Sequence, residues 1–345
     1  MYLNYEKIMK ERPHVVILGA GASCAAIPNG DKHGKKISAM NGFIEKLGLS
    51  ELLSQIHIMT KSDNLEDIYM ELDDRSNREK DCENIKFELE QRITKYMTEY
   101  KIPDSPTIYD YLILSLTDKD LIATFNWDPL LVQAYLRVRK YSNNLPYLAF
   151  LHGNVAVGYC EQDNIMGIVN SRCKCGKLLL PVKLLYPIKK KNYKSEIVIQ
   201  KSWKELQKNL KSAYMVTIFG YSAPKSDIEA ISMLKEAWGT PEDRNLEEIE
   251  IIDIRAEDDV ISSWKDFKHT HHYSYCNNFF DSTLGKFPRR SCEATFNRLM
   301  KCQFLHGDRG FKEGMNFFEI MEKISPLIQE EIDKKGTGQI LDKLY

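Results

Sequence analysis

Small polar residues and glycines follow several short apolar segments of this chain. Gly19 to Ser23 (GAGAS) comes after the first segment, Asn126 to Asp128 (NWD) after the second and His152 to Asn154 (HGN) after the third. Gly220 to Ser222 (GYS) follows the fourth segment, and Asp253 lies inside the fifth. If these segments are strands of one parallel sheet, the groups that follow them meet at its carboxyl edge, where such sheets bind ligands. We therefore expect the amide, carboxylate and imidazole groups to form one site.

The glycines Gly19 and Gly21 suit a tight turn from a strand into a helix. Such a turn lets the backbone approach a pyrophosphate, which the first N–H groups of the helix attract. The third glycine of the usual dinucleotide motif is missing, because Cys24 or Ala25 stands in its place. Nucleotide binding and a turn needed only for packing both remain open. No Walker A loop occurs, which argues against ATP hydrolysis by this chain.

Three side chains in these segments could take part in catalysis. A lone histidine is more often an interior residue than a base, but His152 directly ends an apolar segment, and an imidazole there suits proton transfer near neutral pH. Asp128 would also serve well as the cap of a helix that begins at Pro129. A purely structural role is less plausible for Asn126 than for Asp128, because an amide side chain at the end of a strand usually binds something.

Apolar, β-branched segments alternate with helix signals along the chain, which predicts an α/β fold with a Rossmann-like, doubly wound parallel sheet. Ser105-Pro106 and Asp128-Pro129 predict helix starts, Ser202 with Glu205 predicts a capping box, and Gly239 predicts a helix end. The predicted strands are His14–Leu18, Leu121–Phe125, Tyr147–Leu151, Tyr214–Phe219 and Ile249–Ile254.

Two inserts interrupt this alternation. Residues 31–101 are polar and helical, with Ile85, Leu89, Ile93 and Met97 at four-residue spacing, and predict a helical lobe over the sheet. Residues 155–193 form a small insert that bears cysteines. We predict a binding domain over 1–270 and a mainly helical extension over 271–345, in which Met315 to Ile332 has an amphipathic pattern.

Composition excludes several classes of protein. The 345 residues include 48 Lys and Arg against 49 Asp and Glu, so no overall field draws the chain to nucleic acid or to an acidic membrane. Direct nucleic-acid binding is therefore not expected. No segment has the length and apolar character of a membrane span, and the charged N-terminus does not resemble a signal peptide. Eight cysteines are too dilute for a disulfide framework, so we expect a cytoplasmic protein.

The ordered set GAGAS (19–23), TFNWD (124–128), LHGN (151–154), FGYS (219–222) and IIDI (251–254) resembles the sirtuin family, over about residues 14 to 255. The resemblance implies a Rossmann-like domain that binds NAD and breaks its nicotinamide glycosidic bond. The catalytic residues that it implies are Asn126 and Asp128, around the nicotinamide ribose, and His152 as a base toward a ribose hydroxyl. The cofactor-binding residues predicted with it are Gly19, Ala20, Gly21, Ser23, Gly220, Ser222 and Asp253.

Departures from the family narrow the expected activity. Asn29-Gly30-Asp31 stands where deacylating sirtuins carry Asp-Phe-Arg, and Leu185-Tyr186-Pro187 stands where they present a Phe-Gly-Glu strand to the acyl-lysine peptide. In these respects the chain looks like the bacterial sirtuin-like NAD hydrolases of antiphage defence. The main hypothesis is hydrolysis of NAD to ADP-ribose and nicotinamide by a homo-oligomer. An activating ATPase, helicase or sensor encoded nearby is the expected partner.

Two other activities remain as alternatives, namely an NAD-dependent protein deacylase and a non-catalytic module that binds NAD or ADP-ribose. The cysteine insert raises a separate question. Sirtuins bind structural zinc through two cysteine pairs, whereas Cys160, Cys173 and Cys175 supply three evident ligands here. A zinc site and a degenerate ribbon with free thiols both fit this pattern.

Overall fold

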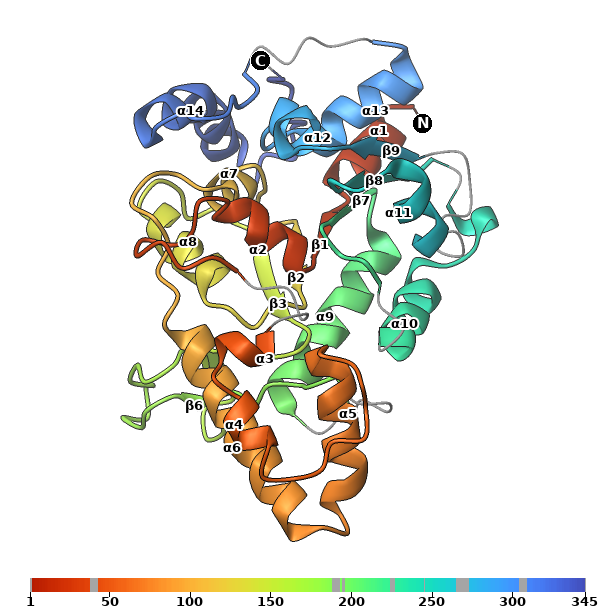
Figure 1. The fold of residues 1–345 in the computed structure, drawn as a ribbon. Helices are drawn as coiled ribbons and strands as arrows, with labels where there is room; N and C mark the ends of the chain where they lie inside the picture. The colour runs from red at the N-terminus through yellow and green to blue at the C-terminus, as the bar shows by residue number, and fades with distance from the viewer. Residues whose placement is uncertain are drawn as a thin grey trace.

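A computed structural model describes residues 2–37, 43–187, 193, 196–223, 227–244, 246–264, 273–303 and 309–344. Its centre is a six-stranded sheet in which every neighbouring pair is parallel (Figure 1). The strands are β1 (His14–Leu18), β2 (Leu121–Thr124), β3 (Tyr147–Phe150), β7 (Met215–Phe219), β8 (Glu248–Ile252) and β9 (Tyr273–Cys276). The predicted α/β, doubly wound sheet is confirmed, and its first five strands match the predicted ones to within one or two residues.

The strand order is β3-β2-β1-β7-β8-β9. The chain therefore builds outward from β1 through β2 to β3, then returns to the other side of β1 to begin β7. In register, Val16 of β1 lies opposite Ile122 of β2 and Thr217 of β7. This is the strand order of dinucleotide-binding folds, in which the ligand crevice opens where the order reverses, here between β1 and β7.

Helices cover both faces of the sheet, so alternate strand residues enter two different cores. Ile17 and Val216 face one core, while Val16 and Leu18 face the other. The first core is covered by α9 (Ile197–Ser212), α10 (Ile228–Trp238) and α11 (Glu257–Trp264). The second is covered by α2 (Ala20–Ala26), α7 (Ile108–Leu114), α8 (Leu130–Val138) and α14 (Phe317–Lys334). Burial on both faces explains why β1, β2, β3 and β7 are mostly apolar.

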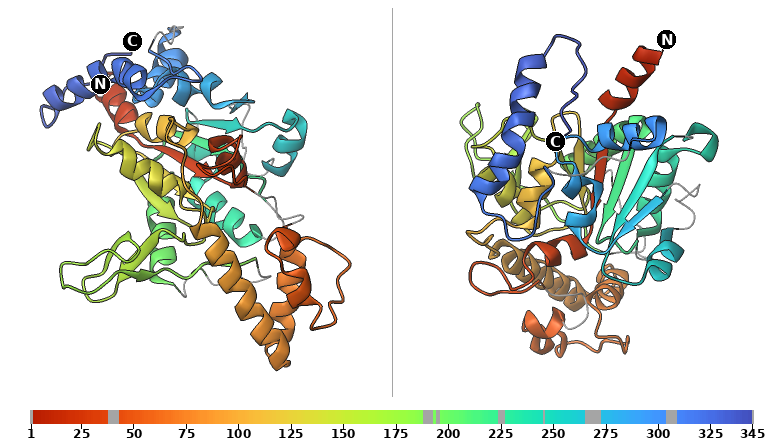
Figure 2. Two further views of the ribbon diagram at one scale, coloured as in Figure 1. Left: turned by 60° about the vertical axis from the view of Figure 1, so that its left-hand side comes forward. Right: turned by 90° about the horizontal axis from the view of Figure 1, so that it is seen from above.

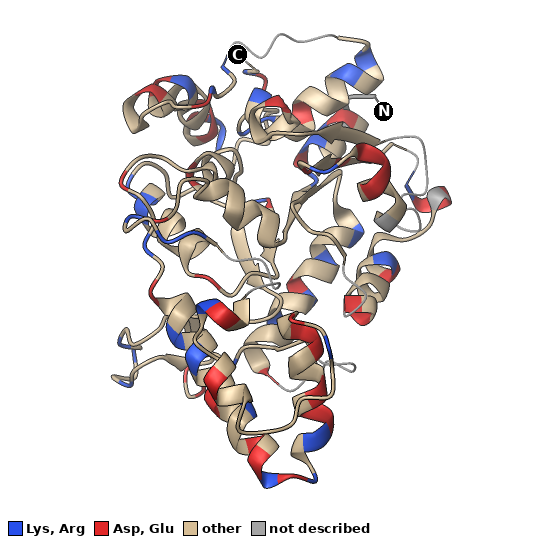
Figure 3. Cartoon of the chain, in the orientation of Figure 1, with Lys and Arg blue, Asp and Glu red and all other residues tan. Residues whose placement is uncertain are grey.

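The first insert is helical, as predicted. Ile85, Leu89 and Ile93 are buried on its longest helix, and its core continues onto Trp127 beyond the end of β2. The lobe therefore packs against the carboxyl edge of the sheet and extends away from it (Figure 2). Acidic and basic residues are interspersed along its helices (Figure 3). Its helices are α3 (Phe43–Lys46), α4 (Ser50–Leu53), α5 (Leu65–Ser76) and α6 (Lys80–Thr98).

The second insert contains a small antiparallel sheet with the order β5-β4-β6. Its strands are β4 (Val157–Cys160), β5 (Ile165–Ile168) and β6 (Leu180–Pro181). Residues 188–192 of this insert lie outside the described part of the chain.

The C-terminal region contributes both a strand and helices. Sequence periodicity did not predict β9, which pairs with β8 as the sixth strand of the main sheet. The domain boundary at residue 270 stays a prediction, although residues on both sides of it form this one sheet. The remaining helices at this end are α1 (Tyr2–Glu11), α12 (Thr283–Lys286), α13 (Ser291–Lys301) and α14, which begins close to the predicted Met315 (Figure 1).

Some of the predicted helix boundaries are wrong. The helix expected at Ser105-Pro106 begins at Ile108, because Thr107 is its cap and donates its N–H to Asp110 Oδ2 at 2.7 Å. Ser202 lies inside α9, where its hydroxyl accepts a hydrogen bond from the Phe150 N–H at 3.0 Å, so it is not a cap. Gly239 ends α10 with a positive φ of 92°, as predicted. Within the described residues, no helix combines the length and apolar composition required to cross a bilayer.

Candidate active site

Two glycine turns interlock where the strand order reverses. The Gly19 N–H donates to Phe219 O at 3.0 Å, and the Gly21 N–H donates to Gly220 O at 2.9 Å. Gly220 has a φ of +59°, and a Cβ there would lie 2.5 Å from Ala22 N. The contact between the two turns therefore requires glycine. The N–H groups of Gly19 and Gly21, which were expected to bind phosphate, already have backbone partners. Ala20 and Gly21 are exposed at this edge. Their contacts with NAD stay predictions.

Four polar side chains form a hydrogen-bonded group beside these turns, which we name the Ser23 cluster: Ser23, Tyr109, Asn126 and Asp128. Ser23 Oγ donates to Asp128 Oδ2 at 2.7 Å and lies 2.6 Å from the Tyr109 hydroxyl. Asn126 Nδ2 donates to Ser23 Oγ at 3.0 Å and to Gly19 O at 2.8 Å. The structure thus brings together three residues that the sequence predicted from segments more than a hundred positions apart.

Asn126 is the half-buried member of this cluster. Its Nδ2 also lies 3.3 Å from the Tyr109 hydroxyl, so several partners fix the orientation of the amide. Asn126 Oδ1 accepts no hydrogen bond from the described part of the chain. The amide therefore presents a fixed acceptor, which could orient a water molecule or a sugar hydroxyl.

Asp128 is buried, and this burial raises the pKa of its carboxyl group. Oδ1 also accepts the Leu130 N–H at 3.1 Å, although α8 begins at Leu130 with Pro129 at its N-cap, one residue later than predicted. Burial likewise raises the pKa of Tyr109, which is fully enclosed. Tyr109 was not predicted as a site residue, because it lies among the apolar residues of α7 and has the pattern of a core tyrosine.

His152 lies beside the cluster, after β3. Its ring packs edge-on against Phe125, the neighbour of Asn126, with centroids 4.8 Å apart. His152 Nε2 lies 3.9 Å from Asp227 Oδ1, and the other oxygen of Asp227 accepts the Tyr221 hydroxyl at 2.7 Å. A carboxylate at this distance can stabilise positive charge that develops on the imidazole. Asp227 was not predicted, because it lies in the segment before α10 and does not directly follow a strand.

Asn154 ties the loop after β3 to the loop after β2. Its Nδ2 donates to Asp128 O at 2.6 Å and to Asn126 O at 3.2 Å. The polar residue at this position therefore fixes the backbone that carries two predicted catalytic residues. Its buried position makes it a positioning residue.

Asp253 and Ser222 are predicted cofactor residues that lie apart from the Ser23 cluster. Among the described residues, neither makes a hydrogen bond to that cluster. Asp253 accepts the Arg255 guanidinium at 2.7 Å, and although burial opposes the effect, these hydrogen bonds hold the pKa of Asp253 below its ordinary value. Ser222 is exposed after β7. Both lie at the carboxyl ends of β7 and β8, so their contacts with NAD stay predictions.

The cysteine insert brings four ligand groups together. The ligand atoms of Cys160, Asp163, Cys173 and Cys175 all lie within 4.8 Å of one another. Three thiols and a carboxylate are a donor set that suits tetrahedral zinc. The sequence predicted the three cysteines as metal ligands, and Asp163 supplies the fourth group that was missing. These residues could hold a zinc ion that joins β4 to the turn around Cys173, where its role would be structural.

Comparison with known proteins finds no matching family model and no matching curated protein. Solved structures that match this chain include several described as Sir2 or sirtuin structures. One, described as "Sir2 bound to acetylated peptide", has a TM-score of 0.38 and 14% identity, and the match covers 88% of this chain and 98% of that chain. Another, described as a "Sir2 homolog-NAD complex", has a TM-score of 0.37 and 15% identity, with coverage of 85% and 90%. Similarity this low does not establish the family or the activity of this chain.

Proposed function

We propose that this chain hydrolyses NAD to ADP-ribose and nicotinamide. The observation that carries the proposal is the amide of Asn126, which is clamped at the end of β2 and keeps one acceptor oxygen open. It lies beside the β1 and β7 turns, where the strand order reverses. Sheets with this strand order bind dinucleotides at that position.

The reaction breaks the bond between the ribose C1′ and the nicotinamide nitrogen. Nicotinamide leaves with the bonding electron pair, and positive charge develops at the ribose, as in glycoside cleavage. Water then adds to C1′ and releases a proton. Asn126 Oδ1 would orient this water or a ribose hydroxyl, and Asp128, held by Ser23, would lie beside it.

His152 is the proposed general base. It would accept the proton from the ribose hydroxyl or from the attacking water. Asp227, 3.9 Å from its Nε2, would stabilise the imidazolium that forms. The Phe125 ring, packed against the imidazole, restricts its orientation.

The proposed NAD contacts lie along the same edge. Ala20, Gly21 and Ser222 are exposed there, and their accessibility supports this assignment. The full set, which stays as the sequence predicted it, is Gly19, Ala20, Gly21, Ser23, Gly220, Ser222 and Asp253.

Nicotinamide release from NAD by the purified chain tests the proposal. Asn126→Ala and His152→Ala should each abolish turnover while the circular dichroism spectrum stays native. Asn77→Ala and His57→Ala are matched controls, because both residues are exposed on the helical lobe. Turnover that survives both site substitutions would show that the residues are wrongly assigned.

The alternatives give different results in the same assay. A protein deacylase would consume NAD only when an acylated peptide is present, and a binding module would retain NAD without turnover. We include in the proposal a cytoplasmic homo-oligomer that depletes NAD in antiphage defence. Because such an enzyme must be kept inactive, the assay is repeated with the protein encoded beside it, which we expect to be the activating partner.

A further inference from the structure

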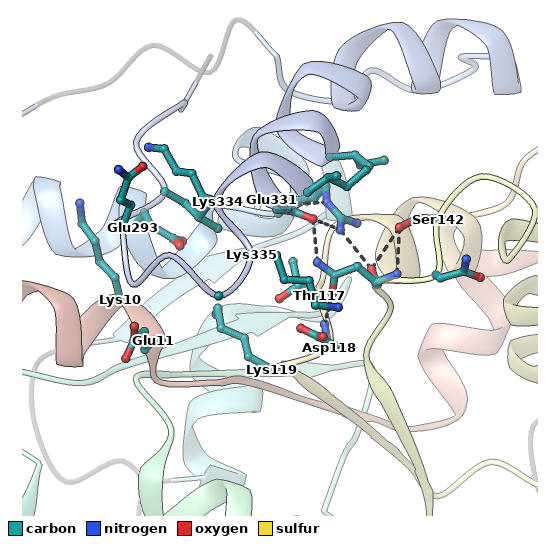
Figure 4. A pocket seen from close by; sticks show the side chains of 18 of the residues that line it. Lys10, Glu11, Thr117, Asp118, Lys119, Ser142, Glu293, Glu331, Lys334 and Lys335 are labelled. Atoms are coloured by element: carbon teal, nitrogen blue, oxygen red, sulfur yellow. Dashed lines mark hydrogen bonds and ion pairs between the residues drawn. The ribbon is translucent and has the colours of Figure 1, made fainter.

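A cavity of about 890 Å³ opens at the amino edge of the sheet, away from the Ser23 cluster. Its lining comes from the segments that precede β1, β2 and β3, together with α13, the end of α14 and the residues after it (Figure 4). Lys334 Nζ donates to Ile340 O at 2.7 Å, which folds the C-terminal segment back to form one wall. The volume is within the range of small-molecule sites.

The cavity is strongly basic. Eight Lys and Arg side chains line it, against four Asp and Glu side chains. Some of these cations are already compensated, as Lys119 is by Asp120 at 2.8 Å. Arg139, Lys140 and Lys335 are exposed and have no carboxylate partner within the described residues. These three cations could bind an anion such as phosphate.

An apolar wall lies in the same cavity. It is formed by Tyr141, together with Ile328, Ile332, Ile340 and Leu341. The ring of Tyr141 stacks on Phe317, with centroids 5.4 Å apart, and Lys140 Nζ lies 4.7 Å from the Tyr141 centroid, so the aliphatic side chains offer the more open part of this wall. A flat, apolar ring of a ligand would pack against such a wall, whereas a simple inorganic anion would gain nothing from it.

Among the described residues, Glu293 is a buried polar residue of the cavity with an unsatisfied acceptor. Its side chain is 3% exposed and lines the space from α13 (Figure 4). Glu293 Oε2 has no hydrogen-bond partner in the described part of the chain. The nearby Glu331, in contrast, has both oxygens occupied by Arg289 and Arg290. An unsatisfied buried acceptor is costly, and an N–H donor of a ligand would remove that cost.

We infer that this cavity binds a nucleoside phosphate whose base carries an exocyclic amino group. Arg139, Lys140 and Lys335 hold the phosphate, the wall around Tyr141 packs on the base, and Glu293 accepts a hydrogen bond from the amino group. A free phosphate, in contrast, would leave both the wall and Glu293 unused. The site is independent of the proposed NAD hydrolysis, so binding is measured directly and without turnover.

Calorimetric titration of the full chain tests this inference with AMP, GMP, CMP, UMP and inorganic phosphate. The first three carry an exocyclic amino group, and UMP does not. We expect these three to bind at least about tenfold more tightly than UMP or phosphate, the factor that one well-placed hydrogen bond supplies. The double substitution Arg139→Ala with Lys140→Ala should weaken their binding about tenfold or more, through loss of charge-assisted contacts.

Arg78→Ala with Lys80→Ala is the matched control, because it removes the same charge from exposed positions on the helical lobe. Glu293→Leu should abolish the preference for amino-bearing nucleotides, and Glu293→Gln, which keeps an acceptor, should retain part of it. Arg139 and Lys140 are exposed, so their double substitution should leave the fold intact. It therefore tests the phosphate contacts even if the Glu293 variants fail to fold. Nucleotide binding that is unaffected by the Arg139 and Lys140 substitutions, or no tighter than phosphate binding, would overturn the inference.

Discussion

The backbone of Gly21 lies directly against that of Gly220, with the Gly21 N–H donating to the Gly220 carbonyl at 2.9 Å. This contact joins the turn after β1 to the turn after β7, at the place where the strand order reverses. The same approach leaves no room for a Cβ at either glycine. The candidate active site is therefore built on a backbone contact that tolerates glycine alone.

Gly220→Ala should lower the free energy of unfolding by about 3 kcal/mol, because a strained φ and a steric clash add together. Gly34→Ala is the control, since Gly34 has a φ of +82° but a Cβ there would meet nothing within 4 Å. Gly34→Ala should lower the free energy of unfolding by only about 1 kcal/mol, because it adds backbone strain without a steric clash. Urea denaturation of both variants makes the comparison, and equal losses would mean that close packing is not what requires Gly220.

Tyr109 should act as a positioning residue for the Ser23 cluster. Tyr109→Phe removes the hydroxyl that lies 2.6 Å from Ser23 Oγ, so the Asn126 amide loses part of its support. We expect kcat for NAD hydrolysis to fall about tenfold with little change in KM, since misorientation weakens the transition state more than binding. Tyr100→Phe is the control, because its buried hydroxyl donates to Lys36 O outside the cluster. Equal activities of the two variants would contradict the role of Tyr109.

His14 should make the protein less stable in acid. Burial lowers the pKa of His14 from 6.5 to about 3, so the folded protein keeps a neutral ring between Ser291 and Thr217. The unfolded chain takes up this proton as the pH falls below 6.5, and the stability is progressively lost between that pH and about pH 3. The loss approaches about 1.4 kcal/mol per pH unit.

His14→Gln lacks this proton uptake, so its unfolding free energy should depend less on pH over the same range. Denaturation of both proteins at several pH values gives the difference between them. A difference that does not change with pH would show that folding leaves the pKa of His14 unchanged.

Much of the fold follows from local sequence, and the parts that do not have physical explanations. The buried strands were predictable because β-branched segments end at glycines or small polar residues, as at Leu18 and Phe219. β9 was not, because its residues Tyr273 to Cys276 are half-exposed at an edge and show no periodicity. The order of the strands was not predictable from local sequence either. It depends on the direction of the crossover connections between strands, which local patterns do not encode.

The candidate site was predictable to a similar extent. Ser23, Asn126 and Asp128 follow strand ends, so topology alone places them at one edge. Tyr109 and Asp163 reach their partners only through tertiary packing. A tyrosine in an apolar helix and an aspartate in a polar turn are common without any function, and their sequence context therefore carries no signal.

Asp163 gives a direct test of the metal site. The purified chain should contain about one equivalent of zinc, as expected for four ligands that can converge. Asp163→Ala and Cys173→Ser should each lose most of this metal and lower the thermal midpoint, because the small sheet loses its cross-link. Cys302→Ser, an exposed cysteine far along the chain, should retain the zinc. Elemental analysis decides the question, and metal-free wild-type protein would leave the cysteines as free thiols.

Glu331 should couple the C-terminal region to the sheet. Its carboxylate binds Arg289 and Arg290, whose side chains are fully buried, and Arg289 in turn donates to Leu116 O at 3.2 Å, just before β2. Glu331→Gln removes the negative charge beside these two buried guanidinium groups. It should lower the free energy of unfolding by about 3 kcal/mol. Glu322→Gln, on the exposed face of α14, should cost almost nothing.

The form of the unfolding transition then tests the predicted domain boundary at residue 270. Because β9 pairs with β8 and Arg289 reaches the segment before β2, the C-terminal region should unfold together with the sheet in one transition. Glu331→Gln should shift that whole transition to lower urea concentration while keeping its slope. An early, separate transition in the variant would instead show that residues 271–345 form a unit whose stability is independent of the sheet.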